Sequence, residues 1–140
     1  FDRDGSVLCV IDLDTVMPSF IFSDVGDFLR TAANYVAEDC PEIAKVGFNM
    51  EIFRSFIKGY LESASSFLTD VERDNLPFAA ALFPFMQAVR FLTDYINGDT
   101  YYKIAYPEHN LVRTRNQMAL FRSILLQMDE MRQIIDRMIF

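Results

Sequence analysis

After Thr15, apolar side chains recur at steps of three and four residues, the spacing of one face of a helix. No run with strand character follows Thr15, so we expect a mainly α fold. Ser23 or Asp24 can cap the first helix, because their side-chain oxygens accept from free backbone N–H groups. The pattern predicts helices over about 25–37, 49–64 and 78–96, and a long last helix after residue 110.

Residues that favour helix ends support this division. Asn49 is a natural N-cap, and Thr69 with Glu72 has the spacing of a capping box. The 97–99 Asn-Gly-Asp sequence is expected to end helix 78–96, which is apolar enough to be largely buried. The last helix is predicted to place one stripe in the core or an interface: Met118, Phe121, Leu125, Met128, Met131, Ile135 and Met138.

Composition suits one folded domain over 1–140. Hydrophobic residues make up 51% of the 140, which is enough for a packed core. A net charge of −7 argues against nucleic acid and against anionic membrane surfaces as partners. We read Cys9 and Cys40 as reduced core residues. The absence of a long uninterrupted apolar run predicts a cytoplasmic protein without a membrane span.

The N-terminal region has a different character. An Asp-Gly turn at residues 4–5 leads into an apolar run over 7–12, which predicts a short buried strand. A buried strand needs hydrogen-bonding partners, and nothing downstream supplies one. We therefore expect its partners to precede Phe1 and the chain to be part of a larger protein. This gives a metal-binding strand and turn over 1–17, followed by a helical subdomain over 23–140.

Two carboxylates stand at the end of this strand. Asp12 and Asp14 are two residues apart, so in an extended strand both side chains point to the same side. Mg²⁺ prefers one or two carboxylates and leaves its other positions to water and phosphate. The pair therefore favours a magnesium site for phosphoryl transfer, although both residues could simply end the strand and cap the next turn.

Two enzyme classes place carboxylates in this way. Haloacid-dehalogenase-type phosphatases begin with an apolar strand and Asp-x-Asp-x-Thr, where the first Asp is a nucleophile and the second an acid/base. That class needs a doubly wound sheet with several further strands. The helical pattern after Thr15 disfavours it.

A second class fits better by resemblance. VIDLDTVMP at 10–18 and SDVGDFLR at 23–30 resemble the metal-binding strand and next helix of the aminoglycoside phosphotransferase and choline kinase superfamily. LPF at 76–78, VRFLTDYINGDTY at 89–101 and YPEHNLVR at 106–113 resemble one branch, the bacterial N-acetylhexosamine 1-kinases. This likeness implies the helical C-terminal subdomain of a protein-kinase-like fold with a short β stub.

The resemblance also implies roles for individual residues. Asp12 would be the aspartate that chelates metal after the catalytic loop, and Asp14 would serve a second Mg²⁺. Asp27 would brace the catalytic loop by hydrogen bonds. The His-x-Asp-x-x-x-x-Asn loop and the ATP-binding lobe are not in this sequence and are expected upstream. No catalytic base is therefore assigned to this chain, and alone it is not expected to transfer phosphate.

Acceptor recognition would fall to the helical remainder. Arg90 lies between apolar neighbours, so its charge needs a ligand oxygen or a buried ion pair with one of three acids, Asp24, Asp27 or Asp94. Tyr101 and Tyr102 follow the 97–99 turn and suit the face of a sugar, or else pack on the core. His109 is read as a helix-start residue, and Asp94 and Asp99 as caps or surface charges.

These observations predict part of an ATP- and Mg²⁺-dependent kinase acting on a sugar hydroxyl, namely the anomeric position of an N-acetylhexosamine. An aminoglycoside, choline or homoserine is the alternative acceptor within the superfamily. A non-catalytic helical interaction domain is the alternative outside it. A homodimer is also expected, formed through the edge of the 7–12 strand and the apolar face that would meet the missing lobe.

Overall fold

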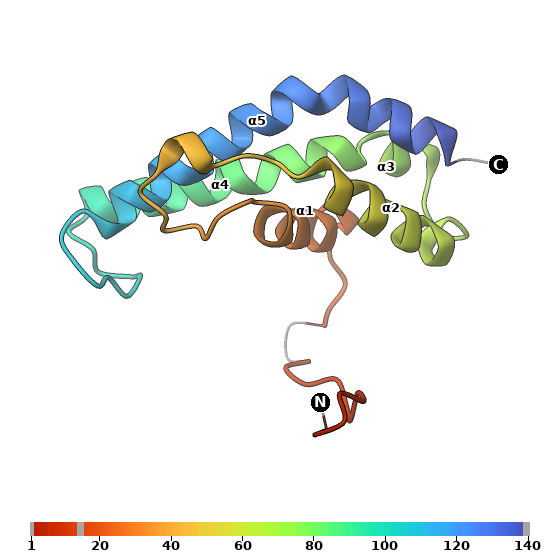
Figure 1. The fold of residues 1–140 in the computed structure, drawn as a ribbon, viewed down its shortest axis with the longest axis horizontal. Helices are drawn as coiled ribbons and strands as arrows, with labels where there is room; N and C mark the ends of the chain where they lie inside the picture. The colour runs from red at the N-terminus through yellow and green to blue at the C-terminus, as the bar shows by residue number, and fades with distance from the viewer. Residues whose placement is uncertain (1, 14–15, 139–140) are drawn as a thin grey trace.

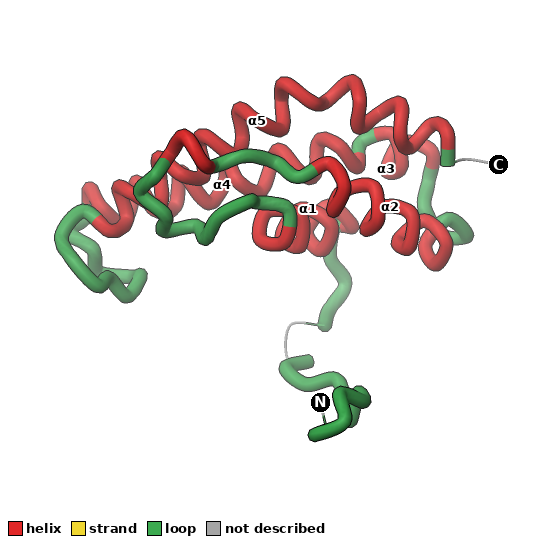
Figure 2. Tube along the Cα trace, in the orientation of Figure 1, coloured by secondary structure: helices red, strands yellow, loops and turns green. Residues whose placement is uncertain are grey.

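The computed structural model describes residues 2–13 and 16–138, which form five α-helices and one short 3₁₀ turn. Figure 2 shows helices joined by loops, with no strand in these residues. The mainly α prediction is confirmed, and the sheet that a phosphatase of the dehalogenase type requires is absent from these two ranges. The elements are α1 (Ile21–Ala32), η1 (Ile43–Lys45), α2 (Met50–Ala64), α3 (Asp70–Asp74), α4 (Leu76–Ile96) and α5 (His109–Arg137).

Helix α4 organises the bundle. It runs beside α5 over much of its length and also packs against α1 (Figure 1). At the crossing with α1, a Cβ on Gly26 would overlap the Phe83 ring and lie 2.6 Å from the Ala79 carbonyl oxygen. Glycine therefore lets the two backbones approach closely. The largest fully buried side chains of the core include Leu29, Phe53, Ile57, Leu76, Leu120, Ile124 and Met131.

Helix α5 buries polar as well as apolar residues. The amide of Asn116 accepts from Asn34 and donates to the carbonyls of Ala37 and Cys40. About two turns further on, Ser123 accepts from the Phe48 N–H. The predicted stripe is therefore only partly right. Met131 and Ile135 are buried, but Leu125 is exposed because the buried face of α5 passes through Leu120 and Ile124.

The helix ends match the sequence signals unevenly. Asn49 caps α2 as predicted, and the Thr69–Glu72 capping box begins α3. Helix α1 starts at Ile21, four residues before the predicted start, with Phe20 at the N-cap and no side-chain cap bond. It ends at Ala32, because the next residues turn to form an antiparallel bridge between Asn34 and Phe48.

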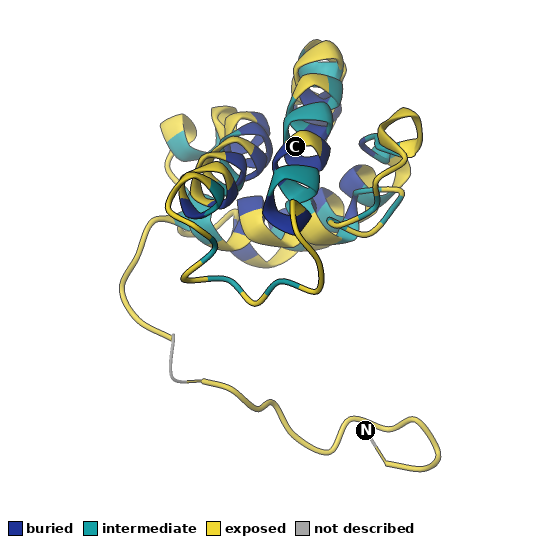
Figure 3. Ribbon diagram, turned by 90° about the vertical axis from the view of Figure 1, so that its left-hand side faces the viewer, coloured by how far each residue is buried: buried dark blue, intermediate teal, exposed yellow. Residues whose placement is uncertain are grey.

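The strand predicted over 7–12 is wrong for the described residues. Its backbone has no ladder partner there, and the large apolar side chains of 7–13 are 58–77% exposed. A strand is stabilised by pairing, so this apolar run stays irregular and projects from the bundle (Figure 3). Both cysteines are free, but Cys9 is exposed in this segment and Cys40 is only half-buried, so neither is a core residue.

Candidate functional site: a hollow at the end of helix α4

A tight turn ends α4 and sets the geometry of the site. The Asp99 N–H donates to the Asp94 carbonyl at 2.8 Å, and the Gly98 N–H donates to the Tyr95 carbonyl at 3.2 Å. This pair of bonds is a Schellman motif, in which Gly98 adopts the left-handed conformation with φ 87°. The predicted end of α4 at 97–99 is confirmed, and the chain leaves the helix in a fixed direction.

The carboxylate of Asp94 then holds the loop that follows. Its Oδ1 accepts from the backbone N–H groups of Thr100 (3.0 Å) and Tyr101 (2.8 Å). Its Oδ2 accepts from the Tyr102 N–H and from the Asn110 side chain, both at 2.9 Å. Burial, which leaves Asp94 only 5% exposed, acts to raise the pKa of this carboxyl, but the four donors outweigh it and lower the pKa. Asp94 is therefore a charged anchor of the loop.

A hollow of about 370 Å³ opens beside this anchor. Its lining combines aliphatic, aromatic, hydroxyl and amide groups with one cation. The residues are Val89, Arg90, Thr93, Asp94, Asn97, Thr100, Tyr101 and Tyr102. A volume of this size falls within the range of about 300–1,000 Å³ typical of small-molecule sites.

Arg90 lies in this hollow but not as predicted. Its side chain is exposed, because α4 is buried on only one face. Among the described residues it forms no ion pair, so the buried pairing with an aspartate is wrong. The guanidinium instead lies over the rings of Tyr101 (5.9 Å) and Tyr102 (5.6 Å). This stacking leaves most of its N–H donors free for another acceptor.

The two tyrosines contribute differently. Tyr101 is 74% exposed and packs edge-on against Tyr102, so its ring forms an open wall. Tyr102 is half-buried against Phe91, and its hydroxyl accepts from the Gln87 amide at 3.1 Å. The structure therefore brings Arg90 and Tyr101 to one place, and Tyr102 fixes that wall to α4.

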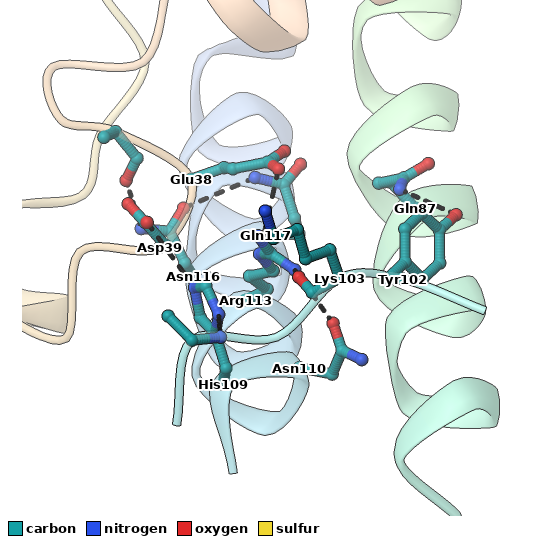
Figure 4. A network of polar contacts seen from close by, with 12 residues as sticks. Glu38, Asp39, Gln87, Tyr102, Lys103, His109, Asn110, Arg113, Asn116 and Gln117 are labelled. Atoms are coloured by element: carbon teal, nitrogen blue, oxygen red, sulfur yellow. Dashed lines mark hydrogen bonds and ion pairs between the residues drawn. The ribbon is translucent and has the colours of Figure 1, made fainter. Parts of the chain in front are cut away.

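A polar network on α5 holds the far end of the loop (Figure 4). The Ala105 N–H donates to His109 Nδ1 at 3.1 Å, and the Tyr106 ring stacks on the imidazole. Arg113 donates to the Lys103 carbonyl and lies over the Phe91 ring. His109 is the first residue of α5, as expected, and it also holds the loop.

The remaining predicted site residues lie elsewhere. Asp27, on α1, pairs with Arg30 at 3.0 Å, and Arg30 also binds Glu38. Asp12 is exposed in the N-terminal segment with a left-handed backbone (φ 64°), and Asp14 lies outside the described residues. The described residues contain no group of three or more potential metal-binding side chains. Asp12 alone matches the donor type of Mg²⁺ but not a complete site, so no chemical step is assigned through a metal.

Sequence reasoning missed Asp94 and Asn110 as the centre of the site. Asn110 donates to both Asp94 Oδ2 and Asp99 Oδ1, so one amide ties the last turn of α4 to the first turn of α5. The available signal was an acid, Asp94, three residues before the Asn97-Gly98 pair that ends the helix. This spacing places a carboxylate close to the backbone N–H groups of the residues that follow the turn. From the sequence alone, Asp94 is instead interpreted as a cap, a surface charge or an ion-pair partner of Arg90.

No protein-family model matches the chain. Within the described part of the chain, α4 is the one helix with the length and apolar composition of a membrane span. Its packing against α1 and α5 explains the apolar residues on one side of the helix, since core helices share this composition. The expectation that the helix is largely buried is wrong, because only 44% of its most apolar stretch is buried. The bundle is compatible with a soluble protein.

Proposed function

We propose that this chain forms the acceptor-binding helical part of an ATP- and Mg²⁺-dependent small-molecule kinase. The acceptor group is a sugar hydroxyl, at the anomeric position of an N-acetylhexosamine. The observation that carries the proposal is that Arg90 and Tyr101, singled out from the sequence, line one hollow beside the anchored loop.

The chemistry of the lining supports a sugar. The exposed ring of Tyr101 offers a flat apolar surface for the C–H face of a pyranose. Around it, Arg90 supplies donors, Asn97 an amide, and Thr93 a hydroxyl that both donates and accepts. An acetamido group needs one donor and one acceptor, and this set offers both.

Phosphoryl transfer itself is assigned to the whole kinase. The sequence contains no His-x-Asp-x-x-x-x-Asn loop, so the base and the nucleotide-binding groups would come from preceding sequence. Asp12 would then face the bound nucleotide from the N-terminal segment. Bound Mg²⁺ would neutralise charge on the transferred phosphoryl group.

A sugar titration tests the acceptor site directly. ¹H–¹⁵N NMR spectra of the chain are recorded with N-acetylglucosamine and N-acetylgalactosamine, then with glucose, choline, homoserine and kanamycin. We expect millimolar binding of the two N-acetyl sugars, with shifts centred on the 97–102 amides. Equal binding of glucose would contradict acetamide recognition, and preference for choline, homoserine or kanamycin would indicate another acceptor. No shift with any of them would overturn the proposal for this site.

Variants locate the binding. Arg90→Ala should weaken N-acetyl sugar binding about tenfold, the effect of losing one good charged hydrogen bond. Arg132→Ala is the matched control, because that arginine is exposed on α5, far along the chain from the hollow, and pairs with Asp129. Equal affinity of both variants would place the sugar elsewhere.

A metal titration separates the kinase from a non-catalytic interaction domain. Mn²⁺, a paramagnetic substitute for Mg²⁺, should broaden amide signals around Asp12, and Asp12→Asn should remove that broadening. Asp2→Asn is the control, since it changes an exposed acid in the same segment. Broadening that persists in Asp12→Asn would favour the interaction-domain alternative.

A further inference from the structure

The outward face of α4 carries a continuous line of large apolar side chains. These residues follow one another at steps of four, three, four, three and four, and we call them the α4 stripe. Five of them are between 39% and 72% exposed, and Leu82 is half-buried. The α4 stripe comprises Phe78, Leu82, Phe85, Val89, Leu92 and Ile96.

The α4 stripe lies at the border of the core. Phe78 packs edge-on against Phe22 of α1, and Phe85 packs against Phe121 of α5, yet both rings stay about half exposed. The buried side of the same helix, including Leu76, Ala80 and Phe91, already packs within the bundle. Only two residues of α4 are charged, and one of them, Asp94, is buried and fully hydrogen-bonded. A large apolar patch with a single neighbouring charge is typical of an interaction surface.

The spacing indicates what fits against it. Alternating steps of three and four are the seam of paired helices that cross at a small angle. The steps have the same order from either end of the stripe. Two copies of the stripe can therefore face each other residue by residue when the two helices are antiparallel. In that arrangement Phe78 lies opposite Ile96, Leu82 opposite Leu92, and Phe85 opposite Val89 of a second copy. Each large ring then meets an aliphatic side chain.

We propose that the α4 stripe binds the α4 stripe of a second copy of this chain, with the two helices antiparallel. The first and last residues of the stripe are 18 positions apart, or about 27 Å along the helix. Its exposed apolar side chains offer roughly 500 Å² per copy, so the pair would bury about 1,000 Å² in total, the lower bound for a specific interface. The antiparallel order also staggers the two Arg90 side chains, whereas a parallel order would set them side by side.

The second copy would also change the hollow. Val89 belongs to both the α4 stripe and the lining of the hollow. In the antiparallel pair, Phe85 of the second copy lies opposite Val89 and adds an apolar wall at that rim. The hollow would therefore be more enclosed in the dimer than in one chain.

Light scattering after size-exclusion chromatography tests the proposal. We expect a mass of about twice 16.2 kDa at micromolar concentrations. Leu92→Glu places a carboxylate in the seam and should raise the dissociation constant about a hundredfold or more. Leu126→Glu is the control, since Leu126 is 88% exposed on α5 and should leave the dimer intact. Circular dichroism confirms that each variant is folded.

Other results would overturn the proposal. A folded chain that stays monomeric at several hundred micromolar has no such interface. A dimer that survives Leu92→Glu but dissociates on Ile11→Glu would be held by the exposed N-terminal segment instead. Spin labels on Phe78→Cys, with both native cysteines replaced by serine, should lie about 27 Å apart along the seam, and about 10 Å would indicate a parallel pair. None of these outcomes depends on sugar binding, so the proposed function and this interface can fail separately.

Discussion

Two irregular segments flank the bundle, and they differ in what holds them. The loop over 97–108 is polar and carries two exposed tyrosine rings, yet its backbone is fixed at both ends by Asp94 and His109. The segment comprising residues 2–13 and 16–20 is rich in Val, Leu and Ile, yet its large apolar side chains are exposed, and it extends away from the helices. The backbone hydrogen bonds of its described residues lie within short turns; the Asp2 N–H, for example, donates to the Ser6 carbonyl.

The comparison shows that specific hydrogen-bonding partners do more than apolar composition to fix the path of a backbone. One buried carboxylate satisfies three consecutive N–H groups in the loop and thereby defines its path. The described apolar residues of the N-terminal segment are exposed, so burial does not offset the entropy cost of fixing their backbone. The residues proposed for acceptor binding are therefore held in place, whereas Asp12 is not.

The largest effect should follow loss of the loop anchor. Asp94→Asn replaces one carboxylate oxygen with an NH₂ group, which cannot accept. Either the Thr100 and Tyr101 N–H groups or the Tyr102 N–H and the Asn110 amide then lose their acceptor. We expect Tm to fall by roughly 5–10 °C, because buried donors lose their partner. Differential scanning calorimetry measures it. An unchanged Tm would mean that the loop is held by its other contacts.

Acid should weaken the same anchor. The pKa of Asp94 is lower in the folded protein than its ordinary value of 3.8, so its stabilising effect is complete above that value. It is lost as pH falls through the lowered folded pKa, because protonation removes an acceptor. The difference in Tm between the native chain and Asp94→Asn should therefore shrink between pH 5 and pH 2.5. A constant difference would assign the effect to packing rather than charge.

Two glycines allow a matched comparison of the segments. Gly98 (φ 87°) and Gly5 (φ 85°) have almost the same left-handed backbone, and nothing lies within 4 Å of a Cβ built on either. Gly98→Ala should destabilise the protein by about 1 kcal/mol, because the strain is imposed by the anchored turn. Gly5→Ala should leave the unfolding free energy unchanged, since that turn can relax without unfolding the bundle. Urea denaturation of both variants measures the change in unfolding free energy. Equal losses of unfolding free energy would mean that the N-terminal turn is coupled to the fold.

The smallest effect is expected at Asp12. Asp12→Asn alters an exposed side chain in the unanchored segment, so Tm should stay within about 1 °C of the native value. Any larger change would show that this segment packs on the bundle. The same variant serves in the Mn²⁺ experiment, where an unchanged Tm allows loss of broadening to be attributed to the metal.

Local signals in the sequence predicted local structure well. The N-cap at Asn49, the capping box at Thr69 and the helix end at 97–99 each depend on residues within a few positions. The bundle's polar contacts were not predictable in this way. Asn116 bonds to carbonyls 76 and 79 residues away, and a backbone carbonyl leaves no trace in the pattern of side chains.

The candidate site was predicted in part for the same reason. Arg90 and Tyr101 were found as a cation and an aromatic residue near a helix end, and they do lie in one hollow. The expectation that Arg90 is buried failed because apolar neighbours along α4 belong to two faces, and one of these is exposed. Asp94 was undervalued because its partners are backbone N–H groups, which every sequence provides.

The anchoring of the loop through its main chain has a consequence for how specificity can change. Asp94 binds the N–H groups of residues 100–102, and these groups are present whichever non-proline residues occupy the positions. Side chains at Thr100 and Tyr101 can thus be exchanged while the path of the loop is kept. A combinatorial library at these two positions, built on an unaltered Asp94, is therefore a suitable starting point for redirecting the hollow toward other small molecules.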